Sequence, residues 1–136
     1  MYKKFIIYTD GGSRGNPGKA GLGAVIKNEA GEIVAEISKY LGVATNNQAE
    51  YQAVIAGLEK ARELGGEELQ FYLDSELVVK QLKGEYKVKN NGLAPLFLKI
   101  HNLLPHFKKI NFTHVRREFN KEADRLANKA MDCGLI

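Results

Sequence analysis

The first half of the sequence alternates short apolar runs with glycine-rich breaks, a pattern typical of strands and turns. Residues 4–9 (KFIIYT) are rich in β-branched and aromatic side chains, and they predict a buried strand that stops at Asp10. A glycine-rich loop is expected over 11–21. Residues 24–28 and 32–41 then predict two antiparallel strands joined by a tight turn.

The pattern becomes helical at Asn46, where apolar residues begin to recur at spacings of three and four. This helix is expected to end near Leu64, before Gly65 and Gly66. The shorter elements that follow are a strand at 69–73, helices at about 75–83 and 94–104, a strand at 109–115 and an amphipathic helix at 121–132 with Asn120 as a candidate N-cap.

The predicted order is therefore βββαβααβα. A strand, a helix and a second strand in succession favour a parallel pairing, whereas the first three strands form an antiparallel meander. We predict a single α/β domain over residues 1–136, with a five-stranded mixed sheet flanked by helices on both faces.

Composition agrees with a globular domain, since 44% of residues are hydrophobic and 26% are charged. The single cysteine, Cys133, cannot form an internal disulfide, and the apolar run before Asp10 is too short for a signal peptide or a membrane span. These features predict a cytoplasmic protein. The net charge of +4 permits a polyanionic partner, although the basic runs at 80–89 and 116–129 also fit solvated helix faces.

Four carboxylates occupy positions with a possible chemical role. Asp10 and Asp74 each follow a predicted strand directly, at the edge where open α/β sheets bind ligands, although turn formation and helix initiation are alternative roles. Glu50 heads the apolar stripe of its helix, and Asp124 lies at the edge of the apolar face of the last helix. A carboxylate directed at the core is costly unless it has a partner.

If these four acids converge, their charges repel one another unless a cation neutralises them. Carboxylate oxygens suit Mg²⁺ or Mn²⁺, and the sequence has no cluster of cysteines or histidines suited to zinc. The sequence therefore predicts one acidic, metal-binding pocket.

The acids lie in four motifs: YTDGGSRGNPGKAG at 8–21, TNNQAEYQA at 45–53, LDSELVVKQLKGEYKVKN at 73–90 and HVRREFNKEADRLANKA at 114–130. Together, these motifs resemble the type 1 ribonuclease H family across nearly the whole chain. The resemblance implies an RNase H-like fold and an endoribonuclease. Such an enzyme hydrolyses the RNA strand of RNA–DNA hybrids and leaves 5′-phosphate and 3′-hydroxyl ends. Nothing in the sequence demands more than a monomer, and sequence specificity is not expected because no segment resembles a base-reading helix.

The resemblance also implies roles for individual residues. Two Mg²⁺ ions, or Mn²⁺ as a substitute, would activate water and stabilise the leaving oxygen while held by Asp10, Glu50, Asp74 and Asp124. The positions that match the family's minor-groove contacts, for which loop-building and capping are the alternative roles, are Gly11, Ser13, Asn16, Asn46, Asn47 and Gln48. The positions that match a pocket for a phosphate of the DNA strand, and the lysines beside it, are Thr45, Asn90, Lys87 and Lys89.

The chain departs from the family pattern in two places. It has no tryptophan, and its segment 84–97 is shorter than the basic protrusion of well-known bacterial relatives. We therefore expect weaker hybrid binding, with Tyr86 either a stacking face or a packed aromatic. The compact segment before the last acid also lacks the family's loop histidine. His114 is a candidate for that auxiliary role, but strand alternation favours a packing role for it. Arg117 is therefore the preferred auxiliary residue at the scissile phosphate, with Glu118 a further candidate.

Two other functions stay open at this point. One is a nuclease of the same fold that acts on duplex DNA, a DNA junction or double-stranded RNA, and the other is a hybrid-binding module without catalysis. Asn46 and Asn47 beside Glu50 favour ribose recognition, and the presence of all four acids favours catalysis. Neither a membrane nor an obligate protein partner is expected.

Overall fold

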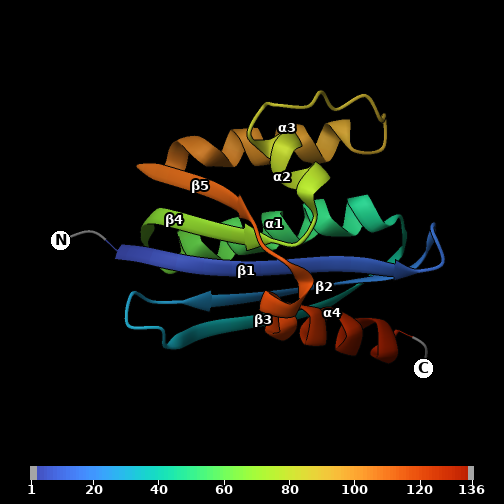
Figure 1. Ribbon diagram of the computed structural model, residues 1–136, viewed down its shortest axis with the longest axis horizontal. Helices are drawn as coiled ribbons and strands as arrows, with labels where there is room; N and C mark the ends of the chain where they lie inside the picture. The colour runs from blue at the N-terminus through green and yellow to red at the C-terminus, as the bar shows by residue number, and fades with distance from the viewer. Residues whose placement is uncertain (1–2, 135–136) are drawn as a thin grey trace.

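The computed structural model describes residues 3–134, and its helices and strands follow the predicted order (Figure 1). The strands are β1 (Lys3–Arg14), β2 (Gly18–Lys27), β3 (Ile33–Ala44), β4 (Gly66–Leu73) and β5 (Lys109–His114). The helices are α1 (Asn46–Glu63), α2 (Glu76–Leu82), α3 (Ala94–Leu103) and α4 (Lys121–Cys133), with short 3₁₀ turns η1 (Leu104–His106) and η2 (Arg117–Phe119). Within residues 3–134, no helix is long and apolar enough to span a bilayer.

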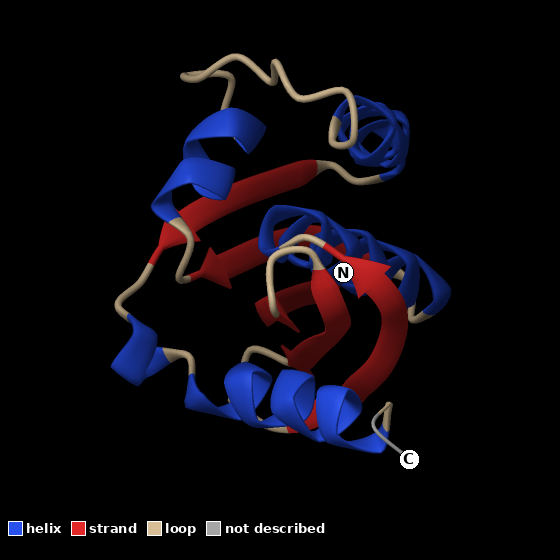
Figure 2. Cartoon of the chain, turned by 90° about the vertical axis from the view of Figure 1, so that its right-hand side faces the viewer, coloured by secondary structure: helices blue, strands red, loops and turns tan. Residues whose placement is uncertain are grey.

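The five strands form one mixed sheet in the order β3-β2-β1-β4-β5. The pairs β1–β2 and β2–β3 are antiparallel, and the pairs β1–β4 and β4–β5 are parallel. Helix α1 packs on one face of the sheet together with α2 and α3, and α4 packs on the opposite face (Figure 2). The predicted α/β class and the mixed sheet are confirmed.

The main core lies between the sheet and α1. The stripe of α1 predicted from the helical period buries Val54 and Leu58 completely. Together with Tyr51 of the same helix, they pack in one cluster with Ile7 of β1 and Phe71 of β4. Burial of side chains of this size contributes about 1.5–3 kcal/mol each to folding. This packing fixes the height and rotation of α1 above β1, and therefore the place of the first helical turn.

The glycine-rich region is mostly strand, so the predicted loop over 11–21 is wrong except at residues 15–17. Glycine there reflects close packing: a Cβ on Gly11 would lie 2.3 Å from the carbonyl carbon and oxygen of Ala49 in α1. As a consequence, Asp10 lies within β1 and does not end it. The parallel pairing of β1 with β4 stops at the pair Thr9–Leu73, so Asp10 still lies where β4 ends.

On the other face, Gly23 of β2 lets α4 approach the sheet. A Cβ at Gly23 would lie 2.2 Å from the Ala123 carbonyl oxygen and 2.7 Å from the Ala127 amide nitrogen. Gly23→Ala is therefore expected to lower the free energy of unfolding by about 1–3 kcal/mol, because the backbone of α4 must move away. Urea unfolding measures this loss. Lys19→Ala, at an exposed position of the same strand, is the control, and equal stability of the two variants would contradict this account of the packing.

Candidate metal centre and active-site cleft

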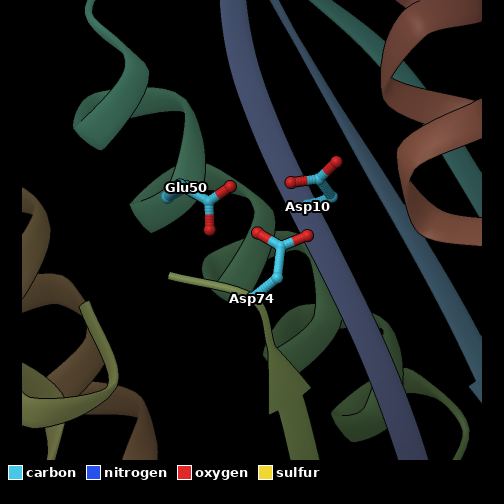
Figure 3. Close-up of side chains that lie close together, drawn as sticks. All are labelled: Asp10, Glu50 and Asp74. Carbon is cyan, nitrogen blue, oxygen red and sulfur yellow. The ribbon is translucent and has the colours of Figure 1, made fainter. Parts of the chain in front are cut away.

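Three carboxylates from distant parts of the sequence meet at the end of β4 (Figure 3). Asp10 comes from β1, Glu50 from the first turns of α1, and Asp74 directly follows β4. One oxygen from each side chain lies within 4.8 Å of the others. Asp10 and Glu50 are buried, and Asp74 is half-buried.

The direction of Glu50 is set by the start of α1. Thr45 and Gln48 form a capping box, in which the Thr45 Oγ1 accepts from the Gln48 amide and the Gln48 Oε1 accepts from the Thr45 amide. One turn on, the Glu50 Oε1 accepts a 2.8 Å hydrogen bond from the Gly11 amide. The other carboxylate oxygen, Oε2, is buried and has no hydrogen-bond partner within the described chain. This unpaired oxygen is available to a ligand.

Burial is the main reason why the ionised forms of Asp10 and Glu50 are disfavoured. Burial raises the pKa of the Asp10 carboxyl to about 7, and the charges of Asp74 and Asp124 add to the rise. Burial also raises the pKa of Glu50 well above its ordinary value, and the neighbouring Asp10 adds to it. A bound cation would stabilise the ionised carboxylates and so offset the free-energy cost of burying their charges. The donor set fits a hard divalent cation, because it consists of carboxylate oxygens and includes the unpaired Oε2 of Glu50.

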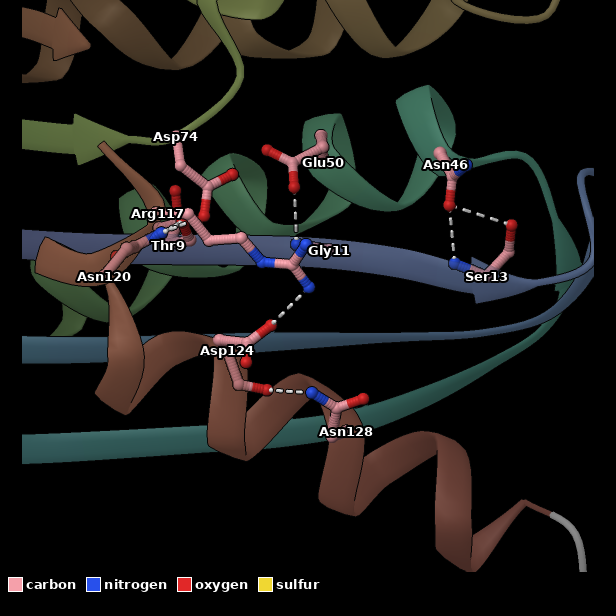
Figure 4. Close-up of polar contacts among 10 residues, drawn as sticks. All are labelled: Thr9, Gly11, Ser13, Asn46, Glu50, Asp74, Arg117, Asn120, Asp124 and Asn128. Atoms are coloured by element: carbon pink, nitrogen blue, oxygen red, sulfur yellow. Dashed lines mark hydrogen bonds and ion pairs between the residues drawn. The ribbon is translucent and has the colours of Figure 1, made fainter. Parts of the chain in front are cut away.

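The fourth acid, Asp124, lies on α4 at the other side of the same cleft, which has a volume of about 460 Å³. Its Oδ1 is 3.8 Å from Nη2 of Arg117, whose side chain is 81% exposed (Figure 4). The structure thus places all four predicted acids around one cleft, with Asp10, Glu50 and Asp74 in the tight group and Asp124 facing them. Their catalytic roles stay predictions.

The predicted minor-groove residues form a connected group beside this cleft. The Ser13 amide and hydroxyl donate to the Asn46 Oδ1 at 2.8 and 3.1 Å, and the Asn46 amide donates to the Asn16 Oδ1 at 3.1 Å. Asn47 follows in the first turn of α1 and is half-buried. These bonds tie the β1–β2 turn to α1, so the loop-building role of the asparagines is present whatever they bind.

The residues predicted for the DNA-strand phosphate also lie together. A Cβ on Gly92 would lie 2.9 Å from the Gln48 Nε2 and 3.0 Å from the Asn90 Oδ1, which brings Asn90 to the start of α1 near Thr45. Lys87 and Lys89 are exposed in the segment that leads to Asn90.

Three sequence-based assignments change with the structure. His114 is exposed at the end of the edge strand β5 and lies beside Glu76, so the expected packing role is wrong, and it does not line the acidic cleft. Tyr86 is 49% exposed with the Lys80 ammonium 5.0 Å from its ring centre, so it is not a packed aromatic. Glu118 of η2 lines a separate hollow with Tyr8 and Lys27, and it does not line the acidic cleft.

Three polar residues of the site were not predicted from the sequence, and one of them, Asn128, lines the cleft and donates from its Nδ2 to the Asp124 backbone carbonyl at 3.0 Å. Arg14 lines the cleft and forms an ion pair with Asp132 of α4. Asn120 was predicted only as a helix cap, but its side chain makes no capping bond, because its φ of −123° and ψ of 28° lie outside the region that caps use. Instead, its Nδ2 donates to the Thr9 carbonyl and to Asp74.

A cluster of carboxylates at the end of β4 in a mixed sheet fits the class of proteins that bind divalent cations for phosphoryl chemistry, which includes nucleases. A family model described as "Reverse transcriptase-like" matches residues 8–130. The chain is 48% identical over 130 residues to the "Bifunctional protein Rv2228c" of Mycobacterium tuberculosis, covering 95% of this chain and 36% of that protein. It is 46% identical over 125 residues to "Ribonuclease HI" of Halobacterium salinarum, covering 92% of this chain and 63% of that protein.

Among solved structures, LC11-RNase H1 in complex with an RNA/DNA hybrid matches with a TM-score of 0.92 and 44% identity, over 97% of this chain and 99% of that one. The chain belongs to the type 1 ribonuclease H family, within the reverse transcriptase-like group. It spans about a third of the mycobacterial relative and under two thirds of the halobacterial one.

Proposed function

We propose that the protein is a ribonuclease H, an endonuclease that hydrolyses the RNA strand of RNA–DNA hybrids without sequence specificity. The observation that carries this proposal is the group of Asp10, Glu50 and Asp74, whose oxygens lie within 4.8 Å of one another. The solved relative bound to an RNA/DNA hybrid supports the substrate class. We expect a cytoplasmic monomer.

Asp10, Glu50 and Asp74, with Asp124 opposite them, would hold two Mg²⁺ ions, with Mn²⁺ as a substitute. When bound, the cations supply activation of water and neutralisation of charge at the phosphate, which yields 5′-phosphate and 3′-hydroxyl ends. The chain supplies orientation: the Gly11 amide fixes one oxygen of Glu50. The exposed guanidinium of Arg117 lies at the rim of the cleft, where it can donate to a phosphate oxygen.

Substrate choice rests on the polar groups beside the acids. Discrimination of RNA from DNA requires contacts to the 2′-hydroxyl, and short side chains and backbone groups can make them. The residues proposed for this role are Gly11, Ser13, Asn16, Asn46, Asn47 and Gln48. Those proposed to bind the DNA strand are Thr45 and Asn90 at a phosphate, Lys87 and Lys89 by charge, and Tyr86 by its exposed ring.

A cleavage assay on three labelled duplexes tests the proposal. A hybrid, a double-stranded RNA and a double-stranded DNA of one sequence are each incubated with Mg²⁺ and with EDTA. We expect cleavage of the hybrid's RNA strand only, only with Mg²⁺, at many positions along the strand. Cleavage of the DNA duplex in preference to the hybrid, or hybrid binding without any Mg²⁺-dependent cleavage, would contradict the proposal. Equal cleavage in EDTA would exclude the metal centre.

A further inference from the structure

One buried asparagine connects three of the four acidic segments through its side chain and its backbone. Asn120, between η2 and α4, is 1% exposed. Its Nδ2 donates to the Thr9 carbonyl oxygen at 2.9 Å and to the Asp74 Oδ2 at 3.1 Å (Figure 4). Its backbone carbonyl oxygen accepts from the Asp124 amide at 3.1 Å, in the first turn of α4, whereas its side-chain Oδ1 is buried and has no hydrogen-bond partner within the described chain. Asn120 therefore contacts the residue before Asp10, the side chain of Asp74 and the backbone of Asp124.

The bond to Asp74 constrains a side chain that has little other support. Asp74 follows the end of β4, and within residues 3–134 the Asn120 amide is the one hydrogen-bond donor found for its carboxylate. Without that donor the carboxylate can rotate about its side-chain torsions. An amide is also neutral, so it orients the carboxylate without taking its charge away from a cation.

Burial at Asn120 makes the constraint rigid. The side chain is enclosed, and its second bond, to the Thr9 carbonyl, fixes the amide plane relative to β1. The same residue begins the helix that carries Asp124. We propose that Asn120 is a positioning residue, which holds Asp74 and the start of α4 at the spacing that a divalent cation requires. Only the cleavage assay of this inference rests on the proposed function; the Mg²⁺ titration does not.

Mg²⁺ binding without substrate separates positioning from a purely structural role. Asn120→Ala removes both side-chain bonds. Ser38→Ala is the matched control, because the Ser38 hydroxyl donates a 2.6 Å bond to the Leu126 carbonyl and so ties the same helix to β3, away from the acids. Both variants and the wild type are titrated with MgCl₂ and followed by amide chemical shifts. Thermal unfolding without metal reports the stability that each variant loses.

We expect the Mg²⁺ concentration at half-saturation to rise about 10-fold or more in Asn120→Ala, since loss of a residue that orients a metal ligand typically costs 10–100-fold in affinity or activity. Ser38→Ala should lose stability but keep the wild-type titration. In hybrid cleavage at a fixed Mg²⁺ concentration, Asn120→Ala should lower kcat and leave KM near the wild-type value.

Identical Mg²⁺ titrations for wild type and Asn120→Ala would overturn the proposal, as would an equal rise in half-saturation for Ser38→Ala. If Asn120→Ala does not fold, Asn120→Ser, whose hydroxyl cannot reach both acceptors, is titrated instead. If the wild type cuts no hybrid, the proposed function fails, but the titration still decides whether Asn120 positions the metal ligands.

Discussion

Asp74→Asn is expected to lower the rate of hybrid cleavage by about 10³-fold or more, because a bound cation contributes several kcal/mol of charge stabilisation and each 1.4 kcal/mol is tenfold in rate. The substitution keeps the size of the side chain but removes a charged ligand from the group formed with Asp10 and Glu50. Hybrid affinity should stay near that of the wild type, since the proposed contacts to the two strands lie beside the acids. Initial rates at saturating Mg²⁺ measure the loss, and fluorescence anisotropy in EDTA measures binding.

Glu76→Gln is the matched control for this substitution. It makes the same carboxylate-to-amide change two residues later, at an exposed side chain that pairs with Lys80 on α2. Its cleavage rate should equal that of the wild type. If Asp74→Asn keeps a rate within about tenfold of the wild type, Asp74 does not hold a catalytic cation and the proposed centre is wrong.

The fold could be predicted from the sequence wherever burial determines the residue pattern. The helical period from Asn46 placed α1 within a residue or two of its observed ends, because one face of that helix is buried completely. The loop predicted over 11–21 from its glycines was wrong, because most of this segment belongs to β1 and β2. Gly11 and Gly21 lie where a helix packs directly on the strand, and a single sequence does not distinguish a glycine needed for close packing from a glycine needed for a turn.

The candidate site, too, could be predicted from the sequence only in part. Glu50 lies on the apolar stripe of its helix, and this position correctly predicted that its side chain points inward. The position is informative because burying a carboxylate costs free energy unless it has a partner. Alternation placed His114 on one face of its strand but could not tell whether another element covers that face. Asn120 precedes a helix, where an asparagine is ordinarily a cap, so nothing local indicated its bond to Asp74, 46 positions away in the sequence.

The same buried acids link the metal centre to stability. Burial raises the pKa of the Asp10 carboxyl from 3.8 to about 7; contact with Glu50 lowers it in part, and Asp74 and Asp124 raise it further. Between these two values the folded chain binds more protons than the unfolded chain, so the free energy of unfolding without metal falls as pH rises. The penalty is absent below about pH 4 and complete above about pH 7. The raised pKa of Glu50 acts in the same direction.

Asp10→Asn should therefore make the metal-free protein more stable at pH 8 while it abolishes cleavage. At about 1.4 kcal/mol per pH unit, the rise from 3.8 to about 7 corresponds to a gain of up to roughly 4 kcal/mol at pH 8, and to no gain near pH 4. Urea unfolding in EDTA across this pH range measures the difference, with Glu59→Gln on the exposed side of α1 as the control.

Adding Mg²⁺ should stabilise the wild type at pH 8 more than the variant, because only the wild type has the full set of charges for the cation to neutralise. The prediction would be contradicted if the difference in free energy of unfolding between Asp10→Asn and the wild type did not change with pH. The ionised Asp10 carboxyl would then cost no stability, and a cation would not be needed to offset such a cost.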